Sequence, residues 1–178
     1  MKHILDKKYL AGLFDGEGCL GIHRIQRSKG QKSYDCCPVI KLGMTDGFEI
    51  MYALKDKYGG DLYTRIYENH TYKDLLSWTL RSKNGILQFL KEIEPHLIIK
   101  NKQARLIRDF YENIIGYIID HKNSKKISKV FKPYGRLCPN ERIRREKLYL
   151  QMKQLNQKGK VQVAAETKRK DISKEMIR

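Results

Sequence analysis

The pattern of apolar and polar positions predicts a succession of short helices and strands. Apolar residues spaced three and four positions apart indicate a first helix over about residues 7–16. Alternation of apolar and polar residues then predicts two pairs of strands, each pair joined by a polar turn. In chain order these strands and turns cover 18–26, 28–33 (loop), 38–44, 61–68, 69–71 (turn) and 75–81.

Three more helices are predicted between and after these hairpins. Thr45 offers an N-cap for a helix that the Gly59-Gly60 pair ends. Ser82 can cap a helix over 83–93, and helical spacing is clearest over 102–119. The order αββαββα followed by a further helix favours an α+β fold, in which one antiparallel sheet carries its helices on one face.

The C-terminal part of the chain differs from the patterned part before it. Residues 1–120 contain the elements of the predicted core. Residues 121–157 are basic, are interrupted by prolines and glycine, and end in a charged helix predicted over 141–157. Residues 158–178 are polar and weakly patterned, so we expect partial disorder there. One core with a basic C-terminal extension is therefore expected.

The charge of the chain points to a polyanionic partner. Among 178 residues, 37 are Lys or Arg and 20 are Asp or Glu, a net charge of +17. This excess favours association with nucleic acid or with an anionic membrane surface. No apolar run approaches the ~20 residues that span a bilayer, the predicted helix 141–157 is too charged for a membrane-surface helix, and the start lacks a signal-peptide pattern. We expect a soluble intracellular protein without a membrane partner, in the cytoplasm, the nucleoid or an organelle matrix.

The cysteines give little indication of a metal site. None of the four makes a C-x-x-C pair, and no histidine lies at a ligand-like offset. They are Cys19, Cys36, Cys37 and Cys138. Reduced thiols of an intracellular protein are the simpler interpretation.

The sheet face that points away from the predicted core is basic and aromatic. By alternation it carries Lys41, Tyr63, Arg65 and Tyr67. Strands of this kind can enter the major groove of DNA. An ordinary solvated sheet face would carry the same residue types, so these residues alone leave both interpretations open.

The first predicted helix contains an unusual run, LAGLFDGEG at residues 10–18. Its three glycines each cost about 1 kcal/mol against alanine in an exposed helix interior, and Asp15 and Glu17 are carboxylates in an apolar stretch. The run resembles the motif of the LAGLIDADG homing endonucleases, from which it differs at Phe14, Gly16 and Glu17. The resemblance covers about residues 5–120. It implies a core of order αββαββα with a saddle-shaped antiparallel sheet.

The resemblance also implies an assembly. In the family, the motif helix packs against its equivalent from a second core, and small residues let the two backbones approach. The corresponding interface residues here are Leu10, Gly12, Leu13 and Gly16. The chain has one such motif, and single-motif members act as homodimers on pseudo-palindromic double-stranded DNA. A C2 dimer is therefore expected.

The resemblance further implies a metal-dependent nuclease site. Glu17 takes the place of the metal-binding acid, with Gly16 as a second ligand, and two or three Mg²⁺ ions would be shared across the dimer. Mg²⁺ suits carboxylate and phosphate oxygens. Asp46, after the second strand, takes the place of a polar residue near the metals. Lys100, in PHLIIKNKQA, matches a lysine that reaches the active site, where it would orient water or stabilise phosphate charge.

The residues expected to contact DNA lie on the outward sheet face. Arginine and lysine there can donate to guanine, and Arg24, at the border of the first hairpin, is expected to grip phosphate. The full set is His23, Arg24, Lys41, Tyr63, Arg65, Tyr67 and Arg81. A shift of one residue in strand register would exchange the two faces.

The expected activity is a metal-dependent double-strand cut in a long DNA target. The alternative is a nucleic-acid-binding protein of the same fold that has no cleavage activity, such as an intron maturase or a regulator. The presence of Glu17 favours the nuclease.

Overall fold

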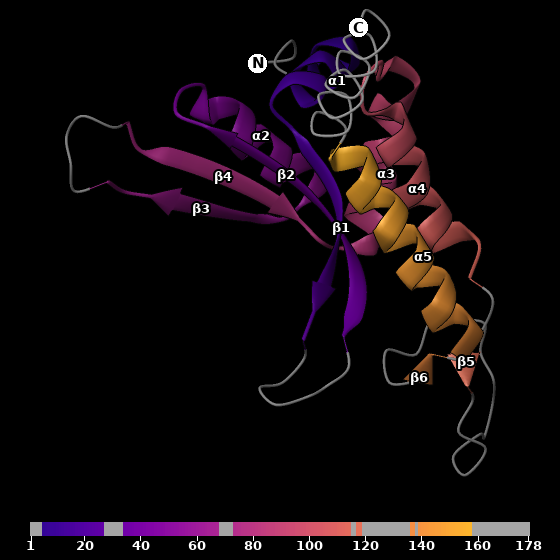
Figure 1. Ribbon diagram of the computed structural model, residues 1–178. Helices are drawn as coiled ribbons and strands as arrows, with labels where there is room; N and C mark the ends of the chain where they lie inside the picture. Colours follow the sequence, from indigo (N-terminus) through magenta and orange to yellow (C-terminus); the bar gives the residue numbers. More distant parts are fainter. Residues whose placement is uncertain are drawn as a thin grey trace, which may run out of the picture.

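The computed structural model describes residues 5–26, 34–67, 73–114, 117–118, 136–137 and 139–157. The predicted loop at 28–33, the turn at 69–71, Cys138 and the tail at 158–178 lie outside the described residues. Within these ranges the order of the core is the predicted one, αββαββα, followed by further helices (Figure 1). The fold class is α+β.

The elements have the following bounds. The helices are α1 (Lys7–Gly16), α2 (Phe48–Tyr58), α3 (Lys83–Ile93), the 3₁₀ helix η1 (Glu94–His96), α4 (Asn101–Glu112) and α5 (Pro139–Asn156). The strands are β1 (Cys19–Ile25), β2 (Asp35–Met44), β3 (Asp61–Arg65), β4 (Leu75–Leu80), and the short pair β5 (Tyr117–Ile118) and β6 (Arg136–Leu137).

The main sheet is antiparallel throughout, in the order β1-β2-β4-β3. One ladder row crosses all four strands, with Cys19 opposite Lys41, Lys41 opposite Thr79, and Thr79 opposite Asp61. Figure 1 shows the β1/β2 and β3/β4 hairpins diverging from this central region, which gives the sheet its saddle shape.

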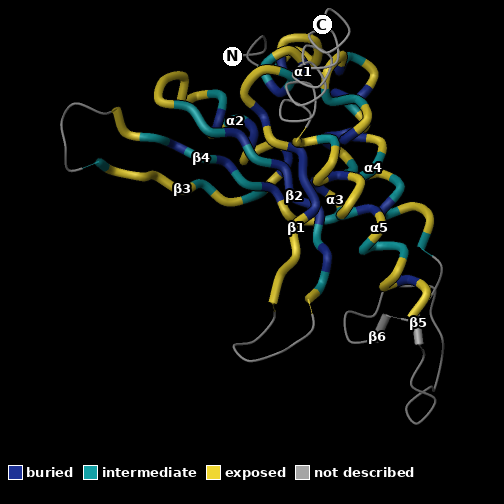
Figure 2. Tube along the Cα trace, in the orientation of Figure 1, coloured by how far each residue is buried: buried dark blue, intermediate teal, exposed yellow. Residues whose placement is uncertain are grey.

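The helices cover one face of the sheet and enclose the core with it. Trp78 of β4, Phe14 of α1 and Phe89 of α3 are fully buried, and their rings contact one another at centroid distances of 4.7–6.2 Å. Figure 2 shows this buried centre in dark blue, whereas β3 is mostly exposed. None of the helices that the structure describes lies against the other face of the sheet in Figure 1.

Helix α5 belongs to this core although the sequence places it in an extension. Leu148 and Met152 are buried in the same cluster as the residues of α1, α3 and α4. Arg144 donates to the carbonyl oxygens of Asp109 (3.2 Å) and Phe110 (3.0 Å), which lie in the last turn of α4. No helix among the described residues is long and apolar enough to cross a membrane.

Helix α4 ends at Glu112, seven residues before the predicted end at 119. Arg144 donates to the carbonyl of Phe110, which a further helical turn would otherwise use. The isoleucines that extended the apparent helical period lie beyond this end, and Ile118 is in β5. Their apolar spacing was therefore misleading.

Two other predicted boundaries are corrected. Helix α2 begins at Phe48 with Gly47 as its N-cap, in a left-handed conformation (φ 74°), so Thr45 is not the cap. Strand β2 begins at Asp35, three residues before the expected start at 38, so Pro38 lies inside the strand. Strand β4 pairs with β2 only from Ile40 onward, so at Pro38 one side of β2 has no partner strand and the missing N–H is tolerated.

Candidate functional site

An acidic residue lies at each end of helix α1. Asp6 caps the start by accepting hydrogen bonds from the N–H groups of Lys8 and Tyr9, both at 3.0 Å. At the other end, the N–H of Glu17 donates to Leu13 and Phe14, and the side chain of Glu17 is exposed. A Cβ at Gly18 would collide with Phe14, so glycine is needed to turn the chain from α1 into β1.

Lys100 reaches this same end of α1 from the start of α4. Its ammonium donates to the carbonyl oxygens of Phe14 (2.8 Å) and Asp15 (2.6 Å), and lies 3.5 Å from that of Gly16. Burial lowers the pKa of Lys100, while the charges of Asp15, Cys19 and Glu17 oppose this shift. Lys100 and Glu17 therefore lie within electrostatic reach of each other at the end of α1.

Asp15 points from α1 toward the segment before α4. Its carboxylate accepts hydrogen bonds from three consecutive N–H groups, those of Ile98 (2.7 Å), Ile99 (3.2 Å) and Lys100 (2.9 Å). Partial burial works to raise the pKa of Asp15, but these hydrogen bonds outweigh it and hold the pKa below its ordinary value. The sequence showed an unexplained acid in an apolar helix, and the structure gives it a partner.

Helix α1 presents an exposed stripe on the side away from the core. Tyr9, Gly12, Leu13 and Gly16 follow helical spacing, and a Cβ added at either glycine would meet no atom within 4 Å. Leu10 is fully buried in the chain's own core, so the predicted role of Leu10 in an interface is wrong. The pattern could not separate the two sides of a short helix that is apolar nearly all round.

Two exposed isoleucines near the end of α1 were not predicted as part of a surface. Ile98 and Ile99 are 87% and 70% exposed, next to the residue that reaches the end of α1. The only sequence signal was a run of adjacent apolar residues without helical or strand period. Their backbone N–H groups bind the carboxylate of Asp15, so these exposed apolar side chains lie near the end of α1.

Asp46 is the third residue that the motif resemblance places near the metals. It lies after β2 and pairs with Lys73 (2.9 Å), and the hydroxyl of Thr45 donates to it. The hydrogen bond from Lys73, with its charge, lowers the pKa of Asp46. Cys19 is opposite Lys41 in the antiparallel pair of β1 and β2, so the residues before Cys19 run toward the end of β2 that precedes Asp46. The role of Asp46 near the metals stays a prediction.

The open face of the sheet gathers cations near its centre. Residues opposite each other in an antiparallel ladder point to the same side, which places Lys41 on the open face with Cys19 and Thr79. The imidazole of His23 lies over Gly21, where an added Cβ would be 3.2 Å from Nε2. Partial burial lowers the pKa of His23, and the charges of Lys41 and Arg81 lower it further. Arg81 also pairs with Asp61 at 3.6 Å.

The outer strand β3 and the residues after it add aromatic and basic groups to this face. Tyr63 is 69% exposed, and the guanidinium of Arg65 lies 5.0 Å from the ring centroid of Tyr67. The predicted register is therefore correct, since odd-numbered residues of β3 point away from the core. Arg24 differs, because it is opposite Cys36 and pairs with Glu146 of α5 on the helix-covered side.

Comparisons with known proteins identify the fold. No family model and no curated protein sequence matches the chain. The homing endonuclease I-CvuI in complex with its target matches with a TM-score of 0.59 and 16% identity, over 85% of this chain and 82% of that one. The archaeal intron-encoded homing endonuclease I-Vdi141I complexed with DNA matches with 0.58 and 16%, over 84% and 82%. The LAGLIDADG homing endonuclease I-SmaMI bound to cleaved DNA matches with 0.56 and 14%, over 84% of this chain and 44% of that one.

The chain has the LAGLIDADG homing-endonuclease fold. In this fold the motif run LAGLFDGEG forms α1 and the turn into β1. The structure brings together Glu17, Gly16 and Lys100 at one end of α1, and gathers His23, Lys41 and Arg81 on the open face. It places Arg24 on the helix-covered side, paired with Glu146, and gives Asp46 an ion pair with Lys73.

The end of the motif helix offers oxygen ligands for a hard cation, but too few in one chain. Glu17 has an exposed carboxylate, and Gly16 has a carbonyl at the end of the helix. Over the ranges that the structure describes, no three His, Cys, Asp or Glu side chains converge. Mg²⁺ keeps several waters and is commonly bound by one or two carboxylates plus substrate phosphates. The donor set therefore fits Mg²⁺ if a second chain and a phosphate complete it.

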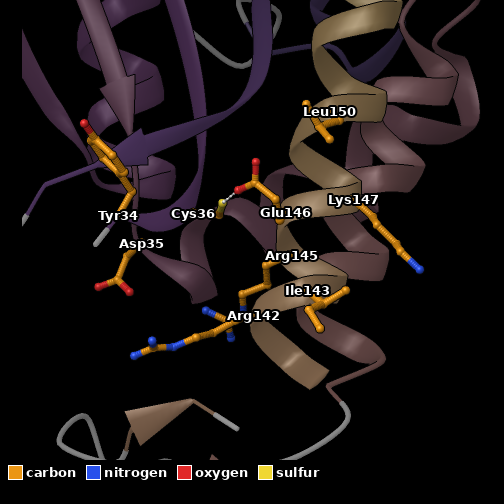
Figure 3. Close-up of a pocket in the computed structure, with 9 residues that line it drawn as sticks. All are labelled: Tyr34, Asp35, Cys36, Arg142, Ile143, Arg145, Glu146, Lys147 and Leu150. Atoms are coloured by element: carbon orange, nitrogen blue, oxygen red, sulfur yellow. Dashed lines mark hydrogen bonds between the residues drawn. The ribbon is translucent and has the colours of Figure 1, made fainter. Parts of the chain in front are cut away.

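A separate cavity of about 380 Å³ lies between the start of β2 and α5 (Figure 3). There the Cys36 thiol lies 3.8 Å from the carboxylate of Glu146, which points toward it, and the ammonium of Lys147 points away. Neither Glu17 nor Lys100 lines this cavity. This cavity is therefore distinct from the cluster at the end of α1.

Proposed function

We propose that the chain is a site-specific DNA endonuclease that cuts both strands of a long pseudo-palindromic target as a homodimer, with Mg²⁺. The observation that carries the proposal is the meeting of Glu17 and Lys100 at the exposed end of the motif helix. A carboxylate and an ammonium beside an open cationic sheet face are the groups that phosphodiester hydrolysis uses.

DNA would lie on the open face of the sheet. His23, Lys41 and Arg81 are close enough there for the two cations to lower the pKa of His23, so the face has a concentrated positive potential. Arg65 and the tyrosines of the outer strand supply donors and flat apolar surface. Phosphate contacts give affinity, and contacts of Arg or Lys with base edges give sequence preference.

Glu17 and the carbonyl of Gly16 would hold the metal ion. A bound Mg²⁺ supplies activation of a water molecule and neutralisation of charge on the phosphate. The ammonium of Lys100 would stabilise negative charge on the scissile phosphate from the other side of the helix end. Its hydrogen bonds to the carbonyls of α1 keep it in place before DNA binds.

A second copy of the chain would complete the site. The exposed stripe with Gly12 and Gly16 permits close approach of two α1 helices, and Ile98 and Ile99 would be covered in the same contact. The likeness to I-SmaMI spans 84% of this chain but only 44% of the longer one, as expected if a longer chain contains two such cores. Two copies of Glu17 would then share the cations between them.

The test begins with selection of bound sequences from a random double-stranded DNA library. Selected sites are incubated with the wild-type chain in Mg²⁺ or in EDTA, and both strands are mapped. Cuts on both strands that require Mg²⁺ support the proposal. Selective binding without any cut would overturn it in favour of a DNA-binding protein of the same fold, and absence of selective binding would overturn both.

A further inference from the structure

Lys100 is attached to α1 twice, once through its backbone and once through its side chain. Its N–H donates to Oδ1 of Asp15 at 2.9 Å. Its ammonium donates to the carbonyl oxygens of Phe14 and of the same Asp15, at 2.8 and 2.6 Å. The two attachments fix both ends of the side chain that reaches the proposed cleavage site.

The carboxylate of Asp15 anchors the backbone of the segment that carries Lys100. It accepts hydrogen bonds from three successive N–H groups, of Ile98, Ile99 and Lys100. The side chains of Ile98 and Ile99 are largely exposed and so contribute little burial to hold the backbone there. Hydrogen bonds to an ionised carboxylate are among the strongest available to a backbone N–H.

We propose that Asp15 is a positioning residue, which sets the ammonium of Lys100 beside Glu17 for cleavage without itself contacting DNA or metal. The proposal rests on the proposed function, because Lys100 has no reaction to serve without it. Asp15 differs from Glu17 in direction, since its carboxylate points into the chain's own backbone whereas that of Glu17 is exposed.

The variant Asp15→Asn tests this role with little change of shape. An amide keeps one acceptor oxygen but has a donor group in place of the second oxygen, so it cannot satisfy all three N–H groups and carries no charge. Asp6→Asn is the matched control on the same helix. Asp6 also accepts two backbone hydrogen bonds, and asparagine caps a helix about as well as aspartate.

We expect Asp15→Asn to lower kcat by tenfold to about a hundredfold, the size of effect that a small displacement of a reacting group produces. The Kd for target DNA stays unchanged, and Asp6→Asn changes neither value. In a Lys100→Gln background, Asp15→Asn costs no further activity, because its effect passes through Lys100. Equal losses of kcat in both backgrounds would overturn the proposal. Asp15→Glu, which keeps the charge, should recover part of the rate, and a rate no higher than that of Asp15→Asn would also count against it.

A second measurement needs no DNA and separates the two proposals. An amine-acylating reagent is applied at fixed pH, and modification of Lys100 is followed by mass spectrometry. Loss of the hydrogen bonds from Asp15 to the backbone of residues 98–100 in Asp15→Asn should raise the rate of modification about threefold or more, relative to wild type and Asp6→Asn. If the wild-type chain cut no DNA, the proposed function would fail while this measurement still decided whether Asp15 holds Lys100. An unchanged rate would show that it does not.

Discussion

The guanidinium of Arg24 on β1 pairs with the carboxylate of Glu146 on α5 and lies 4.4 Å from the ring centroid of Tyr149. This contact joins residues more than a hundred positions apart, on the helix-covered side of the sheet. Together with Arg144, which caps the last turn of α4, it fixes α5 against both the sheet and the helical layer. Helix α5 is thus part of the domain and packs against β1 and β2 on the helix-covered face of the sheet.

Removal of the apolar anchor of α5 should therefore destabilise the whole domain. Met152 is 1% exposed, and Met152→Ala should lower the free energy of unfolding by about 2–4 kcal/mol, as for other buried large-to-small changes. Lys153→Ala, on the exposed side of the same helix, is the control and should stay within about 0.5 kcal/mol. Urea denaturation measures both. A loss at Met152 no larger than at Lys153 would mean that α5 does not share the core.

Mutation of Glu17 should separate binding from cleavage. Glu17→Gln keeps the shape of an exposed side chain but removes its charge, so we expect DNA affinity to be retained and cleavage to fall at least about a hundredfold. Cleavage and filter binding of one mapped target provide the two readouts. Glu49→Gln, in the first turn of α2, is the control carboxylate. Cleavage by Glu17→Gln at the wild-type rate would remove Glu17 from the site.

Substitution of Gly12 should affect dimer formation, whereas substitution of Gly18 should affect the stability of the folded chain. A Cβ added at Gly12 meets no atom of its own chain within 4 Å, and leucine favours helix more than glycine does. Gly12→Leu should therefore fold at least as well as wild type but remain monomeric, with a sedimentation mass near 21 kDa rather than about twice that.

Gly18→Ala is the contrasting variant, because its Cβ would collide with Phe14. It should lose stability through strain in the folded chain, whatever the oligomeric state. A dimer of Gly12→Leu as tight as that of wild type would place the interface elsewhere on the surface.

The sequence predicted the fold well because most of its signals are local. Strand alternation identified both hairpins and the correct open face, since a period of two fixes which residues share a side. The run LAGLFDGEG located the end of α1, where Glu17 and Lys100 meet. These features depend on spacing within one element or on one contiguous motif.

The predictions that failed depend on contacts between distant segments. At the end of α4, Arg144 from α5 donates to a carbonyl that a longer helix would use, and no pattern within residues 102–119 could show this contact. Leu10 is buried in a core that α1 shares with the sheet and the other helices, a packing that depends on segments far from the motif. The partner of Asp15 is likewise more than eighty residues away, so its anchoring role could not be read from the motif alone.

The open face should account for sequence preference and α5 should not. Arg65→Ala removes a cation from the outer strand, and we expect a loss of about 1–3 kcal/mol of discrimination at one position in each half-site. Lys147→Ala removes an equal charge from α5, away from this face, and should leave preference unchanged. Filter binding to the selected target and to single-position variants, at several salt concentrations, distinguishes the two. Relaxed preference in Lys147→Ala but not in Arg65→Ala would reject the open face as the reading surface.

The protonation of His23 should make DNA binding depend on pH. In the free chain, burial and the charges of Lys41 and Arg81 hold the pKa of His23 below its ordinary value, so the imidazole is neutral at pH 7. The lowered pKa of His23 also affects folding. Below about pH 6.5 the unfolded chain takes up a proton on this histidine more readily than the folded chain, so the free energy of unfolding decreases as pH falls. Phosphates placed on the open face would raise the pKa again, so binding should take up a proton and affinity should increase as pH falls from about 7 toward the lowered pKa. His23→Gln should flatten this dependence, whereas His96→Gln, in η1 on the helix side, should retain it. Titrations of one DNA target at several pH values and constant ionic strength measure the slope, and an equal slope in wild type and His23→Gln would exclude His23 from the interface.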